Sequence, residues 1–464
     1  MSRRRLALAV ALVVSLALAP GANGRTRFDT KVLAHVGSPG YPALSLVAPD
    51  RTIYVGTFTN AMGSDTGPSK VFAYSPTGQL LRTYVIQGQT PGASHGVQVA
   101  AIDRRGVLYL LDQNPARVLR LDPRTGAQST YARFKDVQPC IPGTDPADCS
   151  ATVMDNPPEP DYAAWGPDGA MYVTDYTQGL IWRVPIDGGQ AHVWFTDPRL
   201  DGSLFGPAGI VLMPDLRTLM ISTSAGGVTS PDSTTGELYT LPILPTGRPG
   251  TLRKLWESGP IEGPDGFALA RSGNVYMALV GPMINQLVVI SPTGQELARF
   301  PNDHSGDNGS SVPFDEPSSV QFDGNRMIVT NDAFFSGDES HMVIFDVFAG
   351  EPGAPVFVPG VKQPAYTLSV DPRTVRAGER RTFSFHAAFG KDPVAGALVR
   401  FAGAQARTGQ RGNARIPASF SKRGTRRATL TVGGRVVARA SVTVGPRAGG
   451  GGGGPGGGGD DDDD

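Results

Sequence analysis

The feature that most limits how this chain can fold is a repeat of roughly fifty-five residues that occurs six times. Each copy has an apolar strand, a turn of the Pro-Asp-Gly kind, a second apolar strand that ends in a small polar residue, and a third strand. Equivalent positions in the second strands lie 55, 63, 47, 57 and 52 residues apart, at Tyr54, Tyr109, Tyr172, Leu219, Tyr276 and Ile328. Because one repeat cannot bury both of its apolar faces, whereas a closed ring can, the pattern predicts a six-bladed β-propeller.

Composition and strand count support this interpretation. The 464 residues include 60 Gly and 40 Pro, which suits short strands joined by many turns. The sixth copy shows only three strands, while residues 31–36 form an apolar strand ahead of the first copy. We therefore expect the N-terminal strand to complete the last blade. The predicted propeller covers residues 25–357 and is followed by a linker at 358–362.

The first 24 residues have the form of an export signal. Arg3, Arg4 and Arg5 precede an apolar run of fourteen residues, which is short for a membrane span and ends near small residues suited to cleavage. No later stretch is long and apolar enough to span, so we expect a mature chain without a transmembrane segment, secreted or held at the cell surface. In an oxidising compartment, Cys140 and Cys149 predict a disulfide that closes one surface loop.

Residues 363–446 lose the repeat but keep strand signals, which predicts a second β domain. The segments that start at Pro393 and Thr408 resemble bacterial Ig-like modules, and this resemblance implies a small immunoglobulin-like sandwich. Residues 447–464 are mostly Gly and end in a run of Asp, so we expect them to be disordered. The predicted fold class is all-β: a propeller, then a sandwich, then a disordered tail.

The balance of 42 basic and 42 acidic residues hides a segregation of charge. Residues 363–447 hold sixteen Lys and Arg against three Asp and Glu, whereas the propeller region carries a net charge of −11. Three interpretations stay open: a solvated surface on each domain, attachment of the basic domain to an anionic cell-surface polymer, or a contact with the terminal Asp run. We do not expect nucleic acid as a partner, because the basic segment lacks interleaved aromatic residues and a recognised binding motif.

Loops that lead into the innermost strands of a propeller converge at one mouth of its channel. Alignment of the copies on their turns predicts the residues that meet there: one between Tyr41 and Ala43, Gln98 or His95, Asp161, Ala208, Asp265, and Ser318 or Ser319. We expect a small-molecule or other extracellular ligand at this mouth. Gln98, Asp161 and Ser318 are the expected ligand contacts, and Asp265 and His95 are the candidate catalytic groups.

Two segments resemble a known family. Residues 263–278 (GPDGFALARSGNVYMA) and 205–215 (FGPAGIVLMPD) are similar to motifs of the senescence-marker-protein, gluconolactonase and luciferin-regenerating-enzyme family. The resemblance covers the propeller region and implies six blades with one divalent metal ion at the channel mouth. The family's ligands are a Glu from the first blade, an Asn from the fourth and an Asp from the fifth. An Asn from the third blade helps to hold the substrate, and the Asp is also the base for lactone hydrolysis.

Carried over to this sequence, the family pattern is matched in part. Asp265 keeps the fifth-blade acid, as metal ligand and base. Asp161 stands where the third-blade Asn is expected and keeps an oxygen ligand, whereas Ala208 replaces the fourth-blade Asn. No acid lies near Tyr41 to Ala43. Asp161 and Asp265 with water could still hold one divalent cation, with calcium best suited because it accepts carbonyl and water ligands.

Two functions follow. The first is an exported, gluconolactonase-like binding module that takes a small ligand or partner at the channel mouth and has a degraded metal site with weak or no catalysis. The alternative is a divalent-metal-dependent hydrolase of a lactone or ester that uses Asp265 as its base. The missing Glu and Asn favour the first.

Overall fold

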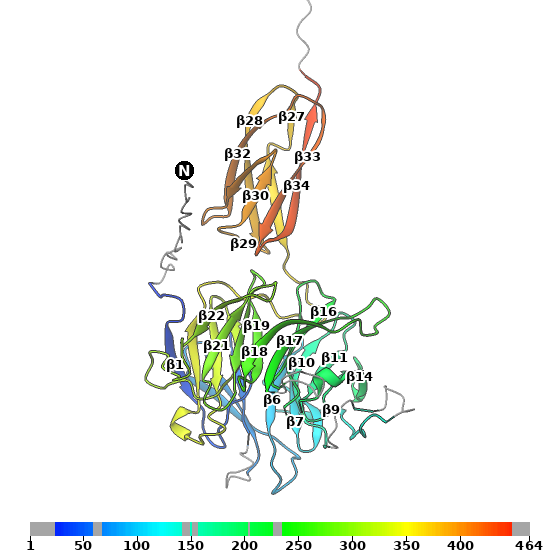
Figure 1. Ribbon diagram of the computed structural model, residues 1–464, viewed down its shortest axis with the longest axis vertical. Helices are drawn as coiled ribbons and strands as arrows, with labels where there is room; N and C mark the ends of the chain where they lie inside the picture. Colours follow the sequence, from blue (N-terminus) through cyan, green and yellow to red (C-terminus); the bar gives the residue numbers. More distant parts are fainter. Residues whose placement is uncertain are drawn as a thin grey trace, which may run out of the picture. The chain divides into compact units, whose positions relative to one another are not determined.

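The computed structural model describes residues 24–58, 67–141, 149–150, 156–202, 205–225 and 234–447 (Figure 1). These residues form strands β1 to β34 and two short 3₁₀ helices, so the predicted all-β fold class is confirmed. The predicted export signal and the Gly and Asp tail lie outside the described residues, except for Gly24 and Arg447. The chain divides into two compact units: the first ends at Pro359, and the second begins at Gly360 and also includes Ser272–Asn274.

The described residues of the first unit form six antiparallel sheets, and in each the strands neighbour one another in a simple meander. In chain order they are β2 (Ser45–Val47), β3 (Ile53–Gly56), β4 (Lys70–Tyr74) and β5 (Leu80–Val85); β6 (Val97–Ile102), β7 (Leu108–Gln113), β8 (Ala116–Leu121) and β9 (Gln128–Arg133); β10 (Pro160–Trp165), β11 (Met171–Asp175), β12 (Leu180–Val184) and β14 (His192–Thr196); β15 (Pro207–Leu212), β16 (Thr218–Thr223), β17 (Thr235–Pro242) and β18 (Arg253–Pro260); β19 (Pro264–Leu269), β20 (Val275–Leu279), β21 (Gln286–Ile290) and β22 (Glu296–Phe300); and β23 (Pro317–Asp323), β24 (Arg326–Asn331), β25 (Val343–Phe348) and β1 (Thr30–His35). The short strand β13 (Gly189–Gln190) pairs in parallel with β9. The 3₁₀ helices are η1 (Pro198–Leu200) and η2 (Glu339–His341).

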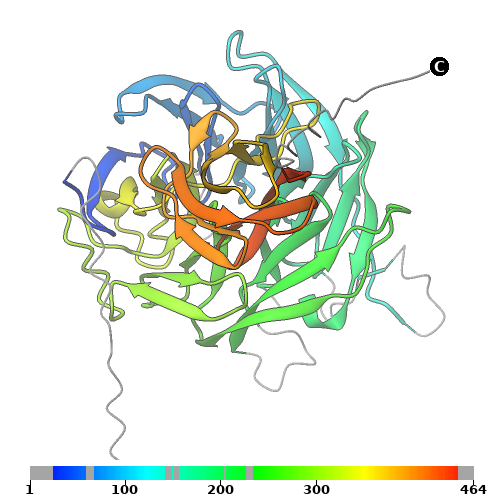
Figure 2. The ribbon, with the colours of Figure 1, turned by 90° about the horizontal axis from the view of Figure 1, so that it is seen from above.

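The first strands of these sheets contact one another in a closed cycle: β2, β6, β10, β15, β19, β23 and again β2. Figure 2 shows the sheets following one another around the first unit in chain order. A cluster of buried apolar side chains lies at each junction between successive sheets, including the junction of the last sheet with the first. Each sheet thus buries both faces against its two neighbours, and the unit is propeller-like.

The ring closes through the N-terminal strand, as the sequence predicts. β1 pairs antiparallel with β25, so the last sheet contains strands from both ends of the first unit. This pairing covers what would otherwise be an open strand edge of β25.

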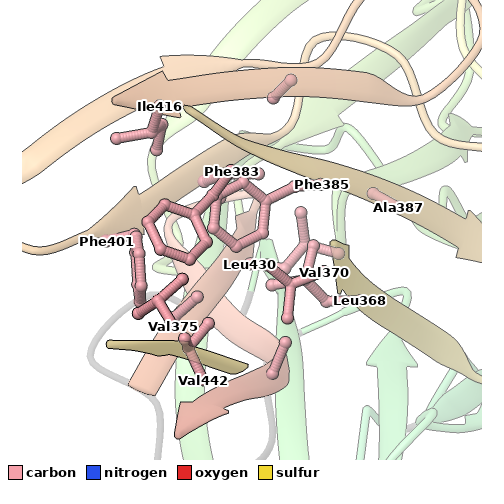
Figure 3. Packing of buried hydrophobic residues seen from close by; sticks show 14 of the residues in the cluster. Leu368, Val370, Val375, Phe383, Phe385, Ala387, Phe401, Ile416, Leu430 and Val442 are labelled. Atoms are coloured by element: carbon pink, nitrogen blue, oxygen red, sulfur yellow. The ribbon is translucent and has the colours of Figure 1, made fainter. Parts of the chain in front are cut away.

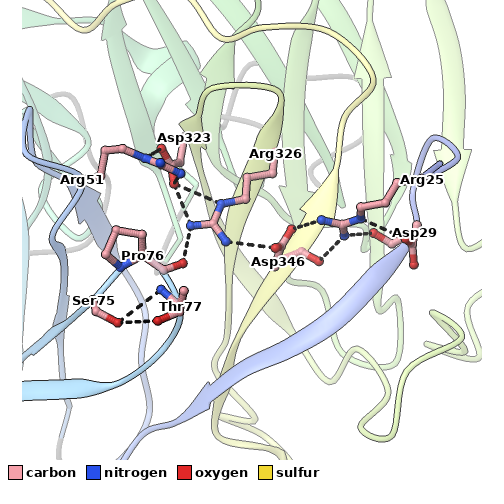
Figure 4. Close-up of polar contacts among 9 residues, drawn as sticks. All are labelled: Arg25, Asp29, Arg51, Ser75, Pro76, Thr77, Asp323, Arg326 and Asp346. Carbon is pink, nitrogen blue, oxygen red and sulfur yellow. Dashed lines mark hydrogen bonds and ion pairs between the residues drawn. The ribbon is translucent and has the colours of Figure 1, made fainter. Parts of the chain in front are cut away.

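Charged side chains reinforce this seam (Figure 4). Asp346 on β25 accepts hydrogen bonds from Arg25 Nη1 at 2.8 Å and from Arg326 Nη1 at 2.9 Å. Arg326 also donates to Asp323 at 2.7 Å, and Arg51 from the first sheet donates to the same carboxylate at 2.8 Å. The network therefore joins the segment before β1, the last sheet and the first sheet.

The predicted disulfide between Cys140 and Cys149 is confirmed, with the two Cα atoms 4.9 Å apart. Backbone hydrogen bonds flank it, since Cys140 N donates to Ser150 O and Ser150 N donates to Gln138 O. In the part of the chain that the structure describes, no helix is long and apolar enough to cross a membrane.

The second unit is a sandwich of two sheets. One contains β26 (Tyr366–Asp371), β28 (Arg380–Phe389), β29 (Asp392–Pro393) and β32 (Asn413–Ser419), and the other contains β27 (Thr374–Arg376), β34 (Arg435–Gly445), β33 (Gly424–Val432), β30 (Leu398–Phe401) and β31 (Ala404–Arg407). Side chains alternate along β28, so Phe383 and Phe385 are buried while Ser384 between them is exposed. Both rings lie against Phe401 of the other sheet, with centroids 5.0 and 5.3 Å apart (Figure 3). The immunoglobulin-like assignment of this sandwich stays a prediction.

Candidate functional site

A cavity of about 420 Å³ lies at one end of the inner strands of the first unit. Described residues from all six repeats line it, from Ala43 in the first repeat to Asp332 in the sixth. Chemically distinct groups gather there: three carboxylates, two amide side chains and several aromatic rings. We call this space the mouth cavity.

The inner strands place equivalent residues around the mouth cavity. In the third, fourth and fifth sheets the inner strand begins with Pro, and its register with the second strand shifts directly after this Pro. Pro is tolerated at the first position of a strand, and a bulge next to it re-aims the following side chain. The residues directly after these Pro residues are Asp161, Ala208 and Asp265. Gln98 is likewise the second residue of its inner strand, where it follows Val97, and all four line the mouth cavity. The structure thus brings together four of the residues that the sequence predicts to converge.

A second set of equivalent positions was not predicted. It comprises the last residue of β7 and the residue directly after the end of β11, β16, β20 and β24. These residues are Gln113, Tyr176, Ser224, Val280 and Asp332, and all of them line the mouth cavity. A signal was present in the sequence, because Asp112, Asp175 and Asn331 recur next to three of these positions. Their side chains bond loop groups, as when Asp175 Oδ1 accepts from Glu159 N and Gln178 N, while the following residues face the cavity.

The three carboxylates of the mouth cavity interact with one another. Burial raises the pKa of Asp161 to about 8, and the nearby Glu159 adds to this rise. Burial, with Glu316 and Asp161, likewise raises the pKa of Asp332 to about 8. The pKa of Asp265 lies well above its ordinary value because of burial and the neighbouring Asp161 and Asp332. No Lys, Arg or His is among the described residues that line the cavity.

Hydrogen bonds fix some polar groups of the mouth cavity and leave others open. Gln98 Nε2 donates to Asp161 Oδ1. The hydroxyl of Tyr162 donates a hydrogen bond to Ser318 O at 3.0 Å. Gln98 Oε1, Gln113 Nε2 and Asp332 Oδ1 are buried without a hydrogen-bond partner among the described residues. Two acceptors and one donor are therefore available to a ligand.

Aromatic side chains form much of the apolar lining. Tyr176 and Phe205 stack with centroids 6.4 Å apart, and Phe334 meets Phe335 edge to face at 5.3 Å. Phe205 and Phe335 are about half exposed although they line the cavity. Exposed aromatic rings beside a cavity are typical of binding sites.

The opposite end of the inner strands has a different character. A smaller cavity of about 110 Å³ there is lined mostly by apolar residues, including the segment Ala354–Val358, with Ser45 and Gln321 as its polar side chains. Phe357 packs against the apolar clusters on both sides of the third sheet, and Val358 packs against the cluster between the first and second sheets. Polar chemistry is therefore concentrated at the mouth cavity.

His95 and Ser318 do not line the mouth cavity. His95 is buried, and its Nδ1 shares a hydrogen bond with Ser69 Oγ at 2.9 Å. Ser318 occupies the place after Pro317, but its hydroxyl donates to Ala43 O at 2.9 Å and so links the last sheet to the first. The proposed roles of His95 as a base and of Ser318 as a ligand contact stay predictions without support from this geometry.

The predicted metal ligands Asp161 and Asp265 lie on the same cavity, but the surrounding donors are few. The equivalent position in the fourth sheet is Ala208, and the first repeat contributes Ala43 and Phe58. Among the described residues, no group of three or more His, Cys, Asp or Glu side chains is arranged to hold a metal ion. Metal binding stays a hypothesis, and we derive no chemical step through a metal ion.

No protein-family model matches the sequence, and no curated protein matches it. Solved structures similar to the chain include virginiamycin B lyase from Staphylococcus aureus, at 14% identity and a TM-score of 0.43 over 69% of this chain and 99% of the other. A luciferin-regenerating enzyme has 12% identity and a TM-score of 0.44 over 70% and 97%. A PQQ-bound aldose sugar dehydrogenase from Streptomyces coelicolor has 15% identity and a TM-score of 0.42 over 69% and 98%. At these TM-scores, none of them assigns a family or an activity to this chain.

Proposed function

We propose that this protein is an exported, gluconolactonase-like six-bladed propeller that binds a small organic ligand in the mouth cavity, with weak or no catalysis. The observation that carries the proposal is that residues from all six repeats line one cavity of about 420 Å³. This volume lies within the range of about 300–1,000 Å³ that is usual for small-molecule sites. Apolar walls with a few polar groups are also typical of such sites.

The polar groups favour binding over hydrolysis. A hydrolytic metal centre needs several oxygen or nitrogen ligands around one point. Here Asp161 is engaged by Gln98, and Ala208 stands where the resemblance implies a ligand. The buried, unpaired acceptors are instead placed to meet donors of a ligand.

A binding screen with a cavity-filling variant tests the proposal. Ala225 is partly buried and lines the mouth cavity, so Ala225→Trp should fill part of the space. Ala404→Trp on an exposed strand of the second unit is the matched control. We expect compounds found by ligand-observed NMR among small amines, alcohols, carboxylates and lactones to lose binding in Ala225→Trp and to keep it in Ala404→Trp. Binding that is equal in both variants would place the ligand elsewhere.

Hydrolysis of a lactone is the second candidate, because Asp161 and Asp265 line the same cavity. If it occurs, turnover of glucono-δ-lactone should require an added divalent cation and should disappear with a chelator and in Asp265→Ala. If turnover persists with the chelator and in Asp265→Ala, or if no turnover occurs at all, metal-dependent lactone hydrolysis is rejected. The binding proposal is not affected by either result.

For the second unit, we propose binding to an anionic surface polymer. Its five-stranded sheet contains seven Arg and no acidic residue. Arg400, Arg427 and Arg439 are exposed, and each is next to a buried residue of its strand. Thr429 pairs with both Arg400 and Arg439, and Arg427 lies two residues from Thr429, so the three arginines share one face.

Arginine suits such a ligand because its planar guanidinium can donate two parallel hydrogen bonds to one phosphate or carboxylate group. The test uses the full mature chain and immobilised polyphosphate. The triple variant R400Q/R427Q/R439Q should release the polymer at a lower salt concentration than the control R380Q/R415Q/K391Q, whose changes lie outside the five-stranded sheet. Equal release by both variants would show that only the net charge matters.

A further inference from the structure

We propose that the ligand of the mouth cavity is an organic cation, a protonated or quaternary amine that carries an apolar group. This inference rests on the proposed function and names the chemical class of its ligand. It depends on three separate properties of the cavity: its charge, its unpaired acceptors and its aromatic walls.

The ionisable groups of the described residues that line the cavity are all acidic. Asp161, Asp265 and Asp332 come from three different sheets and line the same space. Acidic groups also stand behind them, since Glu159 and Asp175 act on Asp161, and Glu316 and Asp315 act on Asp332. No basic side chain is among the described residues that line the cavity. The sequence also has no Lys, Arg or His in the internal segments that the structure does not describe, which are 59–66, 142–148, 151–155, 203–204 and 226–233. When these acids ionise, the cavity carries only negative charge, and a cation is thus the charged group that it can accept.

Two buried acceptors lack a donor. Asp332 is only 8% exposed, and its Oδ1 atom has no hydrogen-bond partner among the described residues. The same holds for Oε1 of Gln98, which is 2% exposed. A buried acceptor without a donor is costly, and an ammonium N–H of a ligand would satisfy it. Gln113 Nε2 adds one unpaired donor, which suits a hydroxyl or carbonyl on the same ligand.

The aromatic walls distinguish an organic cation from a metal ion. Tyr162, Tyr176, Phe205, Phe334 and Phe335 all line the cavity. Ring faces attract ammonium groups and cover the apolar part of an organic molecule, whereas calcium requires about six to eight oxygen ligands at close range. The cavity is also much larger than a bare ion, and its described carboxylates form no metal-binding cluster.

Calorimetric titration of the full mature chain at a pH of about 9 tests this inference, because Asp161 and Asp332, whose pKa is about 8, are then mostly ionised. The probes are 2-phenylethylamine and benzyltrimethylammonium, with neutral 2-phenylethanol, anionic 3-phenylpropionate and calcium chloride for comparison. We expect at least one of the two cations to bind about tenfold or more tightly than the alcohol, because a charge-assisted hydrogen bond or a cation–π contact is lost in the neutral compound. The carboxylate should not bind.

Variants locate the effect. Asp332→Asn keeps the shape of the side chain and should weaken binding of the cation about tenfold or more while leaving binding of the alcohol nearly unchanged. Glu257→Gln on the outer strand β18 is the control and should leave both unchanged. Phe334→Leu should weaken the cation severalfold.

The outcomes separate the two proposals. If the alcohol binds as tightly as the cations and Ala225→Trp abolishes its binding, the cavity is a ligand site but the cation assignment is overturned. Cation binding that survives both Asp332→Asn and Asp265→Asn overturns the assignment as well. So does stoichiometric calcium binding that neither amine displaces. If no probe binds in any charge state, the proposed function fails together with this inference.

Discussion

Removal of Asp346 gives a direct test of how the first unit closes. Its carboxylate accepts from Arg25 Nη1 and Arg326 Nη1, and the three side chains are 14%, 18% and 15% exposed. Asp346→Ala would leave two guanidinium groups without this acceptor at the junction of β1 and β25. Each keeps one other carboxylate, Asp29 for Arg25 and Asp323 for Arg326.

The expected loss follows from these contacts. A hydrogen bond to a charged group contributes about 1.5–3 kcal/mol, and removal of one partner from a buried ion pair costs about 3–5 kcal/mol. Because the remaining carboxylates keep partial pairing, we expect a loss of about 2–4 kcal/mol. With an unfolding entropy near 2.1 cal/mol/K per residue over roughly 330 residues, this corresponds to a decrease in Tm of about 3–6 °C.

Differential scanning calorimetry of the chain from Arg25 onward measures the effect on the transition of the first unit. Glu257→Gln, which breaks a half-exposed pair with Lys254, is the control, and its loss should stay below about 1 kcal/mol. The Tm of Asp346→Asn should lie between the Tm values of Asp346→Ala and Glu257→Gln, because the amide keeps an acceptor but loses the charge. A Tm for Asp346→Ala equal to that of the control would refute the reasoning. The ring would then be held by the β1–β25 hydrogen bonds and apolar packing alone.

Three further predictions concern the cavity, the disulfide and the second unit. Since burial and Glu316 raise the pKa of Asp332 to about 8, above the unfolded value of about 3.9, the folded state holds this proton more tightly. The contribution of this proton to stability is complete below the unfolded pKa and is lost as the pH rises through about 8. In urea titrations between a pH of about 5 and about 9, the free energy of unfolding should therefore fall less in Asp332→Asn than in the wild type. Parallel curves for the two proteins would contradict this prediction. Replacing Cys140 and Cys149 by Ser should lower the free energy of unfolding of the first unit by about 2–3 kcal/mol, and a reducing agent should then have no further effect. Phe383→Ala should destabilise the second unit by about 3–5 kcal/mol, which calorimetry should detect as a shift of its transition while that of the first unit stays in place.

Much of the fold can be predicted from the sequence because its determinants are local. Apolar strands, Pro and Gly turns and a period near fifty-five residues specify the sheets one at a time. The role of β1 follows from counting, since the sixth copy has one strand too few. The seam network is harder to predict, because Arg25, Arg51 and Asp346 are far apart in sequence and meet only when the ring closes.

The sequence predicts the site only in part, because its residues are far apart in sequence and meet only when the ring closes. Gln98, Asp161 and Asp265 follow from alignment of the inner strands, and the structure brings them together. Asp332 is harder to predict, because the recurring small polar residue at the end of the second strand is its neighbour Asn331. The Asn331 amide donates to Pro313 O and His341 O and so bonds loop groups, whereas the next residue lines the cavity. The residue at or directly after the end of the second strand lines the cavity in five sheets, and only the closed ring reveals this.

The Pro-Asp dipeptide shows why the chemistry of the mouth depends on position in the ring. At Pro214-Asp215 it forms a hairpin turn, where Asp215 Oδ1 accepts from Arg217 N and Thr218 N and is satisfied by its own turn. At Pro264-Asp265 the same dipeptide begins an inner strand, and the register shift after Pro264 turns Asp265 into a space already occupied by Asp161 and Asp332. The first carboxylate stabilises a loop, whereas the second faces two others without a cation among the described residues. Because the difference arises from the ring and not from the dipeptide, the class of ligand follows from the assembled cavity, and the titrations with charged and neutral probes test that step.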